Sequence, residues 1–312
     1  MPDCHNGQAP ERPTDDQDEI DPTQAPAVSS PPVRQLFSVP TPIKRIFDRF
    51  PLVIYPPNEL PTRLAPHARC NRLFVFLDIA GARQRKPSFN PQCLRWQAYL
   101  KFVGIDFELV PSTNHASPSG ALPYLLPAPS VESPLPIPAH KLQKWAIEQV
   151  HCEEEQQISV RFDVYASLLD HRIRNAWLYQ LYLDNDNFNA VARRLYVNFA
   201  TSSTIVRAAL AIQLQQAARD ELRKYSDYID VNDLEAEAGN AFEALSILLG
   251  SATYFFDRGK PGFFDASVFA YTHLILEENM MWKHNRLGQL LRRHENLVQH
   301  RERILEDYFG NR

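Results

Sequence analysis

Residues 88–128 decide the fold of this 312-residue chain and read SFNPQCLRWQAYLKFVGIDFELVPSTNHASPSGALPYLLPA. Asn90 is placed to cap a helix, and Pro91 follows at the first helical position, where its missing N–H is not needed. Apolar side chains then recur at helical spacing until Gly104 stops the helix. We therefore predict a helix of about three turns with one buried stripe. The stripe is formed by Cys93, Trp96, Leu100 and Val103.

Four segments around this helix have the composition of strands. RLFVFLDI at 72–79 is a continuous apolar run, as expected for a strand buried on both faces. IDFELV at 105–110 predicts a second strand, and a third begins after Pro123. PLPIPA at 134–139 predicts a short strand at the edge of the sheet, because proline is tolerated there. The sequence leaves open whether the bond before Pro123 is cis or trans.

The first predicted strand and the helix are joined by GARQRKPSFNP at 81–91, a connection longer than such loops usually are. We predict a loop here, and it carries Arg83, Arg85 and Lys86. Two interpretations stay open. The cations either belong to a solvated loop or contact an acidic partner or an anionic lipid surface.

The N-terminal part of the chain has a different composition. Residues 1–42 are rich in proline and acidic side chains and poor in aromatic ones, which predicts a disordered tail. Residues 43–71 form an extended apolar arm. The arm either packs on the protein's own core or binds a partner, since exposed apolar patches mark interfaces. The arm residues that we assign to partner binding are Phe50, Leu52, Ile54 and Tyr55.

Residues 72–139 hold the predicted strands and form one domain, and from residue 140 to 312 helical periodicity takes over. Within 201–225 two neighbouring apolar rows predict a helix with a wide, largely buried face. The rows are Val206, Leu210, Leu214 and Ala217, and beside them Ile205, Ala209 and Ile212. One last helix is predicted from about residue 284, with His294 on its apolar row.

Composition excludes several classes of function. No basic block stands out in a chain of net charge −4, so we expect no nucleic-acid partner. The four cysteines form no CxxC pair, which favours a reducing compartment, and we expect no metal and no cofactor. No segment has the length and composition of a membrane-spanning helix, so any membrane association is expected to be peripheral.

The order βαβ-ββ followed by helices resembles the glutathione transferase fold, an α+β fold with a thioredoxin-like N-terminal domain and an all-helical C-terminal domain. A second segment, FFDRGKPGFFDASVFAYTHLIL at 255–276, is similar to the part of that superfamily in which an aspartate opens a central helix. Asp265 would accept hydrogen bonds from the first backbone N–H groups of that helix. Gly262 stands where the usual pattern has a hydroxyl residue, so only half of a capping box is present. The resemblance assigns structural roles to Asn90, Pro91, Trp96, Pro123 and Asp265.

Within that superfamily, the 88–128 segment, the FPLVIYPPNELP arm and the Asp265 region resemble the metaxin-like proteins, in particular the fungal metaxin-like subunit of the mitochondrial sorting and assembly machinery. The resemblance implies a peripheral protein on the cytosolic face of the mitochondrial outer membrane. Its expected partners are a membrane-embedded β-barrel assembly subunit, a second metaxin-like subunit and β-barrel precursors. The implied function is non-enzymatic: the protein caps the barrel subunit and binds the terminal strand signal of precursors for their insertion.

The competing interpretation is a glutathione-dependent thiol transferase, which needs a hydroxyl or thiol at the start of the first helix. Ser88 is displaced by the long connection, and Cys93 shares the buried stripe, so we expect an inert thiol. Ala139-His140-Lys141 lacks the polar pair that holds the γ-glutamyl group in these enzymes. We therefore expect no catalytic residue. A soluble protein-binding scaffold is the third alternative.

Overall fold

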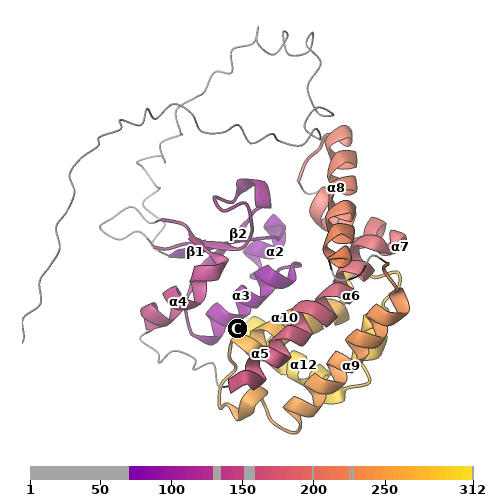
Figure 1. The fold of residues 1–312 in the computed structure, drawn as a ribbon. Coiled ribbons are helices and arrows are strands. Elements are labelled where there is room, and N and C mark those ends of the chain that lie inside the picture. The colour runs from indigo at the N-terminus through magenta and orange to yellow at the C-terminus, as the bar shows by residue number, and fades with distance from the viewer. Residues whose placement is uncertain are drawn as a thin grey trace, which may run out of the picture. The chain divides into compact units, whose positions relative to one another are not determined.

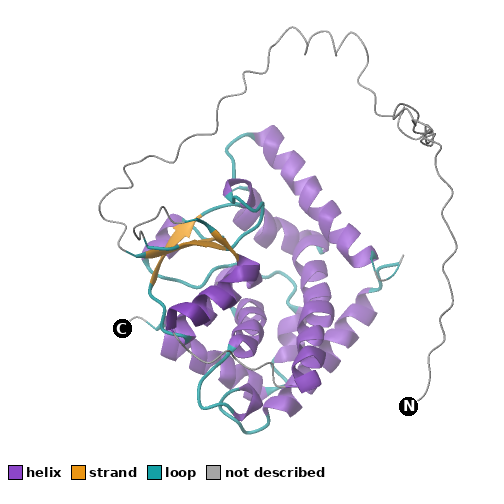
Figure 2. Ribbon diagram, turned by 60° about the vertical axis from the view of Figure 1, so that its left-hand side comes forward, coloured by secondary structure: helices purple, strands orange, loops and turns teal. Residues whose placement is uncertain are grey.

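The computed structural model describes residues 70–128, 135–150 and 159–310, except Phe199, Tyr225 and Asp227. These residues belong to one compact unit, Arg63–Arg312. Figure 1 shows its sheet on one side of a larger body of helices, and the strands again occupy one side in Figure 2.

The sheet has four strands in the order β2-β1-β3-β4. The first two strands run parallel, and the third and fourth are antiparallel to their neighbours. Leu73 and Val75 of β1 are fully buried, as expected for the central apolar strand. The observed β1 is shorter than the predicted 72–79. The strands are β1 (Asn71–Val75), β2 (Phe107–Pro111), β3 (Tyr124–Leu126) and β4 (Ile137–Pro138).

Helix α3 (Pro91–Phe102) lies under the sheet and follows from its sequence (Figure 1). The Asn90 side chain accepts a hydrogen bond from the backbone N–H of Cys93 at 3.1 Å. Gly104, with φ of +78°, turns the chain away after the helix, a conformation that a side chain would strain. The helix buries Cys93, Trp96 and Leu100 of the predicted stripe, but Leu94 and Tyr99 are buried as well, so more than one face of the helix is covered.

Residues 81–91 are not the continuous loop that the sequence predicted. Ile79–Arg83 form a short helix, α2, because the Asp78 carboxylate caps the backbone N–H of Gly81 at 2.5 Å. A Cβ on Gly81 would lie 2.7 Å from that carboxylate oxygen, so only glycine fits under this cap. The Asp78 cap was the signal in the sequence that was missed.

The rest of the described chain is helical. Helix α4 packs against β3 and β4, and α5 continues through π-helical turns into α6. A turn, η2 (Asn114–Ala116), lies between β2 and β3. The helical elements after the sheet are α4 (Ala139–Val150), α5 (Ser159–Ser167), η3 (Leu168–Ile173), α6 (Arg174–Leu178), η4 (Tyr179–Leu183), α7 (Asn185–Asn187), η5 (Phe188–Val197), α8 (Thr204–Arg223), α9 (Val231–Leu249), η6 (Phe255–Asp257), α10 (Phe263–Leu276), η7 (Glu278–Met280), α11 (Arg286–Leu291) and α12 (Glu295–Phe309).

Helix α10 is the centre of this part because it is buried on nearly all sides. It packs directly on α3, where the ring of Phe263 lies 4.9 Å from Trp96 and 5.3 Å from Tyr99. One aromatic cluster thus joins α10 to α3. The sheet-bearing part and the helices share a single hydrophobic core.

Two predictions about the helices are wrong. Helix α8 does not bury a wide face: Ile205 is 83% exposed, and Ile212 is 69% exposed. Only Ala218 and Leu222 of this helix are buried, and both lie in its second half. The predicted last helix is divided into α11 and α12, so that His294 is the N-cap residue before α12 and is half-buried rather than in the core.

Candidate functional site

The start of α3 is where an enzyme of this fold would hold its reacting group, and here protein atoms occupy it. Pro91 opens the helix and Asn90 caps it. Ser88 is completely buried, and its hydroxyl donates to the Phe76 carbonyl at 2.6 Å. Its backbone N–H donates to Gln97 Oε1 at 2.9 Å. Ser88 is therefore held in place by the fold, through both its hydroxyl and its backbone N–H.

Cys93 is the thiol closest to this helix start, and it is completely buried. Burial raises its pKa to about 12, while hydrogen bonding to the Phe76 backbone and to Ser88 acts in the opposite direction. A reactive thiol requires the reverse, a pKa lowered toward neutrality. The environment of Cys93 therefore favours the protonated, unreactive form.

Tyr196 of η5 closes the space in front of this helix start. Its hydroxyl donates to the Phe89 carbonyl at 3.1 Å and accepts from the Asn90 side chain at 3.4 Å. Its ring contacts Phe76 and Phe89 edge-on, with centroids 5.2 and 5.3 Å away. Burial raises the pKa of Tyr196 well above its ordinary value, so the hydroxyl stays protonated and keeps its donor role. No pattern in the sequence pointed to this residue.

The other residues with a structural assignment lie in the core. The Leu122–Pro123 bond is cis and leads directly into β3. Trp96 is buried between α3 and α10. Asp265 is 1% exposed and accepts from the backbone N–H groups of Gly262 at 2.9 Å and Phe255 at 3.0 Å, and it lies 2.9 Å from His300 Nε2. Gly262 has no side chain, so the capping box is half complete, as expected.

The three cations of the β1–α3 connection are exposed but face two different cavities. Arg83 and Arg85 line a cavity of about 370 Å³ between α2 and β2. Lys86 lines another, of about 440 Å³, together with Leu274 and Met280 of the helical part. The structure thus separates residues that the sequence grouped together. Phe50, Leu52, Ile54 and Tyr55 lie outside the described residues.

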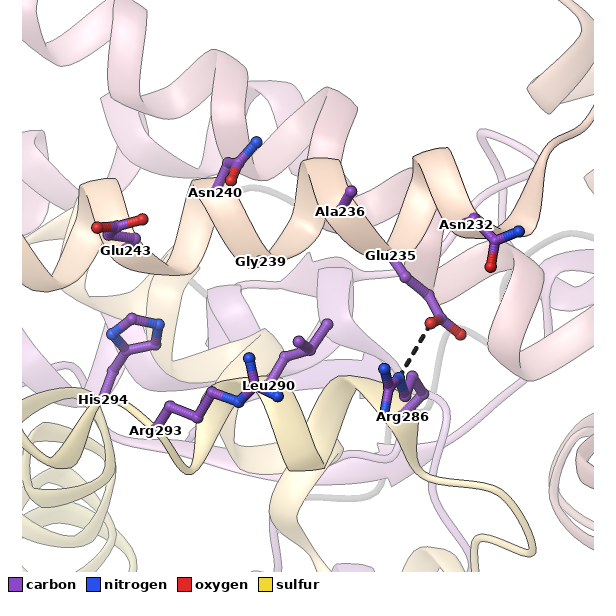
Figure 3. A pocket seen from close by; sticks show the side chains of 10 residues that line it. All are labelled: Asn232, Glu235, Ala236, Gly239, Asn240, Glu243, Arg286, Leu290, Arg293 and His294. Atoms are coloured by element: carbon purple, nitrogen blue, oxygen red, sulfur yellow. Dashed lines mark hydrogen bonds and ion pairs between the residues drawn. The ribbon is translucent and has the colours of Figure 1, made fainter.

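A groove of about 410 Å³ runs between α9 and α11 (Figure 3). Glu235 and Arg286 face each other across it and form an ion pair at 3.0 Å. Glu243 and His294 lie opposite each other at its other end (Figure 3). The acidic side chains of the α9 wall face basic side chains on the opposite wall, so the charges of the two walls compensate. The groove therefore has no dominant sign of charge and indicates no ligand class.

Two kinds of feature are absent from the part of the chain that the structure describes. Within it, no three His, Cys, Asp or Glu residues gather to hold a metal ion. None of the helices described there has both the length and the hydropathy needed to cross a bilayer.

Comparisons with known families match three parts of the chain. Residues 37–92 match the family described as SAM35, subunit of SAM complex. Residues 91–187 match the glutathione S-transferase N-terminal domain, and residues 238–304 match the glutathione S-transferase C-terminal domain. The sheet and helices observed here agree with these two matches, so the fold is glutathione-transferase-like.

Among individual proteins, the chain is similar to metaxin-3 from Xenopus laevis, with 28% identity over 233 residues that cover 72% of this chain and 73% of that protein. Solved structures similar to this chain include glutathione S-transferase III in apo form, with 13% identity, a TM-score of 0.44 and coverage of 77% of this chain and 94% of that one. Another is a glutathione transferase from Pseudomonas putida, with 11% identity, a TM-score of 0.45 and coverage of 78% and 90%. These two superpositions are too loose to add to the fold assignment.

Proposed function

Since this chain is a metaxin-like protein of the sorting and assembly machinery, associated with the mitochondrial outer membrane, we propose that it acts there as a non-enzymatic subunit. It caps the membrane-embedded barrel subunit on the cytosolic side and binds the terminal strand signal of β-barrel precursors. A second metaxin-like subunit completes its set of partners. Its attachment to the membrane is peripheral.

One observation carries the non-enzymatic part of this proposal: Tyr196 fills the space at the start of α3. Its hydroxyl donates to the Phe89 carbonyl and accepts from the Asn90 side chain, so the Asn90 amide is engaged within the protein. The raised pKa of Cys93 supports the same conclusion. The fold that serves catalysis in transferases serves here as a scaffold.

The assignment to a protein assembly draws on the match of residues 37–92 to SAM35 and on the similarity to metaxin-3. The exposed half of α8 agrees with a protein that presents surface to partners, since Ile205 and Ile212 are large aliphatic side chains in solvent. Further support comes from the exposed cations Arg83 and Arg85 beside the sheet.

Affinity purification of the tagged full chain from detergent-solubilised mitochondria tests the proposal. We expect the outer-membrane barrel subunit to co-purify in stoichiometric amount. Carbonate extraction of membranes that lack the barrel subunit is expected to release the chain, and retention would contradict peripheral attachment. Crosslinking to a terminal-strand peptide should exceed crosslinking to the same peptide with its apolar residues replaced by serine.

Glutathione binding decides the enzymatic alternative. Titration calorimetry with reduced glutathione at millimolar concentration is expected to give no heat of binding to the wild-type chain. Saturable binding, together with glutathione-dependent thiol transfer that disappears in Cys93→Ser, would establish the thiol transferase instead.

A further inference from the structure

The cavity beside β2 combines three features that no structural role explains. It lies between α2 and β2, which is an edge strand of the sheet. Its lining includes aliphatic side chains and two guanidinium groups. Ile79, one of the wall residues, is 62% exposed. Arg83 and Arg85 of the α2 side and Glu108 and Leu109 of β2 also line it.

The outer edge of β2 offers unpaired backbone groups. Ser112 N–H donates to the Val75 carbonyl at 2.9 Å, which fixes the parallel register of the two strands. In that register the N–H groups of even-numbered β2 residues point at β1, and those of Phe107 and Leu109 point to the open edge. No other described strand pairs with this edge. Such an edge is a template for a segment in extended conformation.

The two arginines give the cavity its sign. Within the described residues, neither the Arg83 nor the Arg85 guanidinium forms a hydrogen bond or an ion pair, and both are exposed. The acid in the lining, Glu108, lies against the thiol of Cys70 and raises the pKa of that thiol as a hydrogen-bond partner, after burial. Two free cations beside one engaged carboxylate favour an acidic ligand group.

Arg85 also occupies a backbone position where glycine is the usual residue. Lys86 N–H donates to Gly81 O at 2.9 Å and Arg85 N–H donates to Ala82 O at 3.1 Å, which closes α2. This pattern places its central residue in the left-handed region, and Arg85 has φ of +54°. An arginine here is less favourable for the fold than glycine, so its presence suits a contact made by its side chain.

We propose that the groove between α2 and the open edge of β2 binds an extended segment of a β-barrel precursor. The segment's backbone pairs with β2, an apolar side chain enters the cavity between Ile79 and Leu109, and a carboxylate meets Arg83 and Arg85. This inference rests on the proposed function, for which it names the binding surface. A flat lipid surface cannot enter a cleft between a strand and a helix, and two cations make a small electrostatic footprint for it.

The test measures binding of a fluorescent terminal-strand peptide with one acidic side chain to the full-length chain by anisotropy. The double variant Arg83→Glu/Arg85→Glu is expected to weaken binding on the order of tenfold, since two charge contacts are reversed. Arg83→Lys/Arg85→Lys should retain most of the affinity. The matched control Arg292→Glu/Arg293→Glu makes the same change in net charge at two adjacent exposed arginines remote in sequence from the groove, and it should bind like wild type.

A peptide with its carboxylate converted to the amide completes a double-mutant cycle. It should bind wild type on the order of tenfold more weakly and lose nothing further with Arg83→Glu/Arg85→Glu. In addition, Arg85→Gly should leave the chain folded, by its circular dichroism spectrum, while weakening peptide binding. These results together support a direct contact between the carboxylate and the two arginines.

Several outcomes would overturn the inference. Equal affinity of wild type and Arg83→Glu/Arg85→Glu for the peptide would exclude the groove as the binding site and leave the proposed function intact. Failure of the wild-type chain to bind any terminal-strand peptide, while it still co-purifies with the barrel subunit, would remove signal binding and the inference with it. An equal loss of peptide affinity in Arg83→Glu/Arg85→Glu and in Arg292→Glu/Arg293→Glu would show a general effect of charge. The arginines would belong to a lipid contact if the chain bound vesicles of phosphatidylcholine with about 20% phosphatidylserine through them. They would belong to a contact between two copies of the chain if Arg83→Glu/Arg85→Glu abolished a dimer.

Discussion

Replacing Asp265 by alanine tests the buried contact between α10 and α12. The carboxylate serves three groups at once: the N–H of Gly262, the N–H of Phe255 and the ring of His300. Loss of a helix N-terminal cap alone costs about 0.5–2 kcal/mol. Here the partners are also buried, with His300 fully inaccessible, and each group left without an acceptor costs about 1–3 kcal/mol. We expect Asp265→Ala to lower the free energy of unfolding by about 2–5 kcal/mol, since the cap and the buried contacts are lost together.

Urea denaturation of the full-length chain, followed by tryptophan fluorescence, measures this change. Asp233→Ala is the matched control, because Asp233 is also a first-turn acid, on α9, but is exposed. It should change the free energy by no more than about 0.5 kcal/mol. Combining Asp265→Ala with His300→Ala should give a coupling energy of about 1 kcal/mol or more, since the residues touch. A loss below about 1 kcal/mol for Asp265→Ala, or strict additivity in the double variant, would refute the shared buried network.

Four further predictions concern single side chains. Burial, and then the charge of Arg301, lowers the pKa of His273 to about 3, below the ordinary value of about 6.5, so the unfolded chain binds the extra proton as pH falls. Unfolding free energy should therefore decrease by up to about 1.4 kcal/mol per pH unit below pH ~6.5, and urea titrations at pH 7 and 5.5 should show a smaller decrease in His273→Gln; identical slopes would contradict this. Cys93 should resist iodoacetamide in the native chain and react only after unfolding, while the half-buried Cys70 reacts before it, as peptide mass spectrometry can establish; rapid native labelling of Cys93 would contradict its burial. Arg85→Gly should leave the unfolding free energy unchanged or raise it by up to about 1 kcal/mol, because glycine relieves the left-handed backbone strain, and a lower melting temperature would speak against that strain. Tyr196→Phe should destabilise the chain by about 0.5–1.5 kcal/mol, since the Phe89 carbonyl loses its donor, and equal stability by urea denaturation would show that this bond contributes nothing.

The sequence was most informative where local chemistry and burial point the same way. The cap at Asn90, the proline after it and the apolar spacing all specify α3, and the structure has that helix over Pro91–Phe102. The strands were identified in the right order, although β1 ends earlier than the apolar run suggests. Each of these features depends on residues close together in the chain. Local patterns therefore sufficed for the helix and the strands, and the resemblance of their order to glutathione transferases supplied the fold.

Periodicity failed where burial depends on distant partners. Helix α8 has two apolar rows, but a row says only which side chains lie together, and nothing about what covers them. The described neighbours cover only its second half, so Ile205 and Ile212 remain in solvent. The same limit applies to His294. It was assigned to the apolar row of one continuous helix, but the structure has two helices, α11 and α12, and His294 lies between them.

By itself, then, the sequence determined the helix at 91–102 and the succession of strands along the chain around it, because these follow from backbone hydrogen bonding and spacing over a few residues, and the cap at Asp265 came from the resemblance. Only the tertiary structure decided the fate of the site at the start of that helix. Tyr196 reaches it from more than 100 residues along the chain, and no local pattern can encode a contact of that separation. The groove beside β2 has the same origin, since α2 and β2 meet there only because the chain between them folds back as α3.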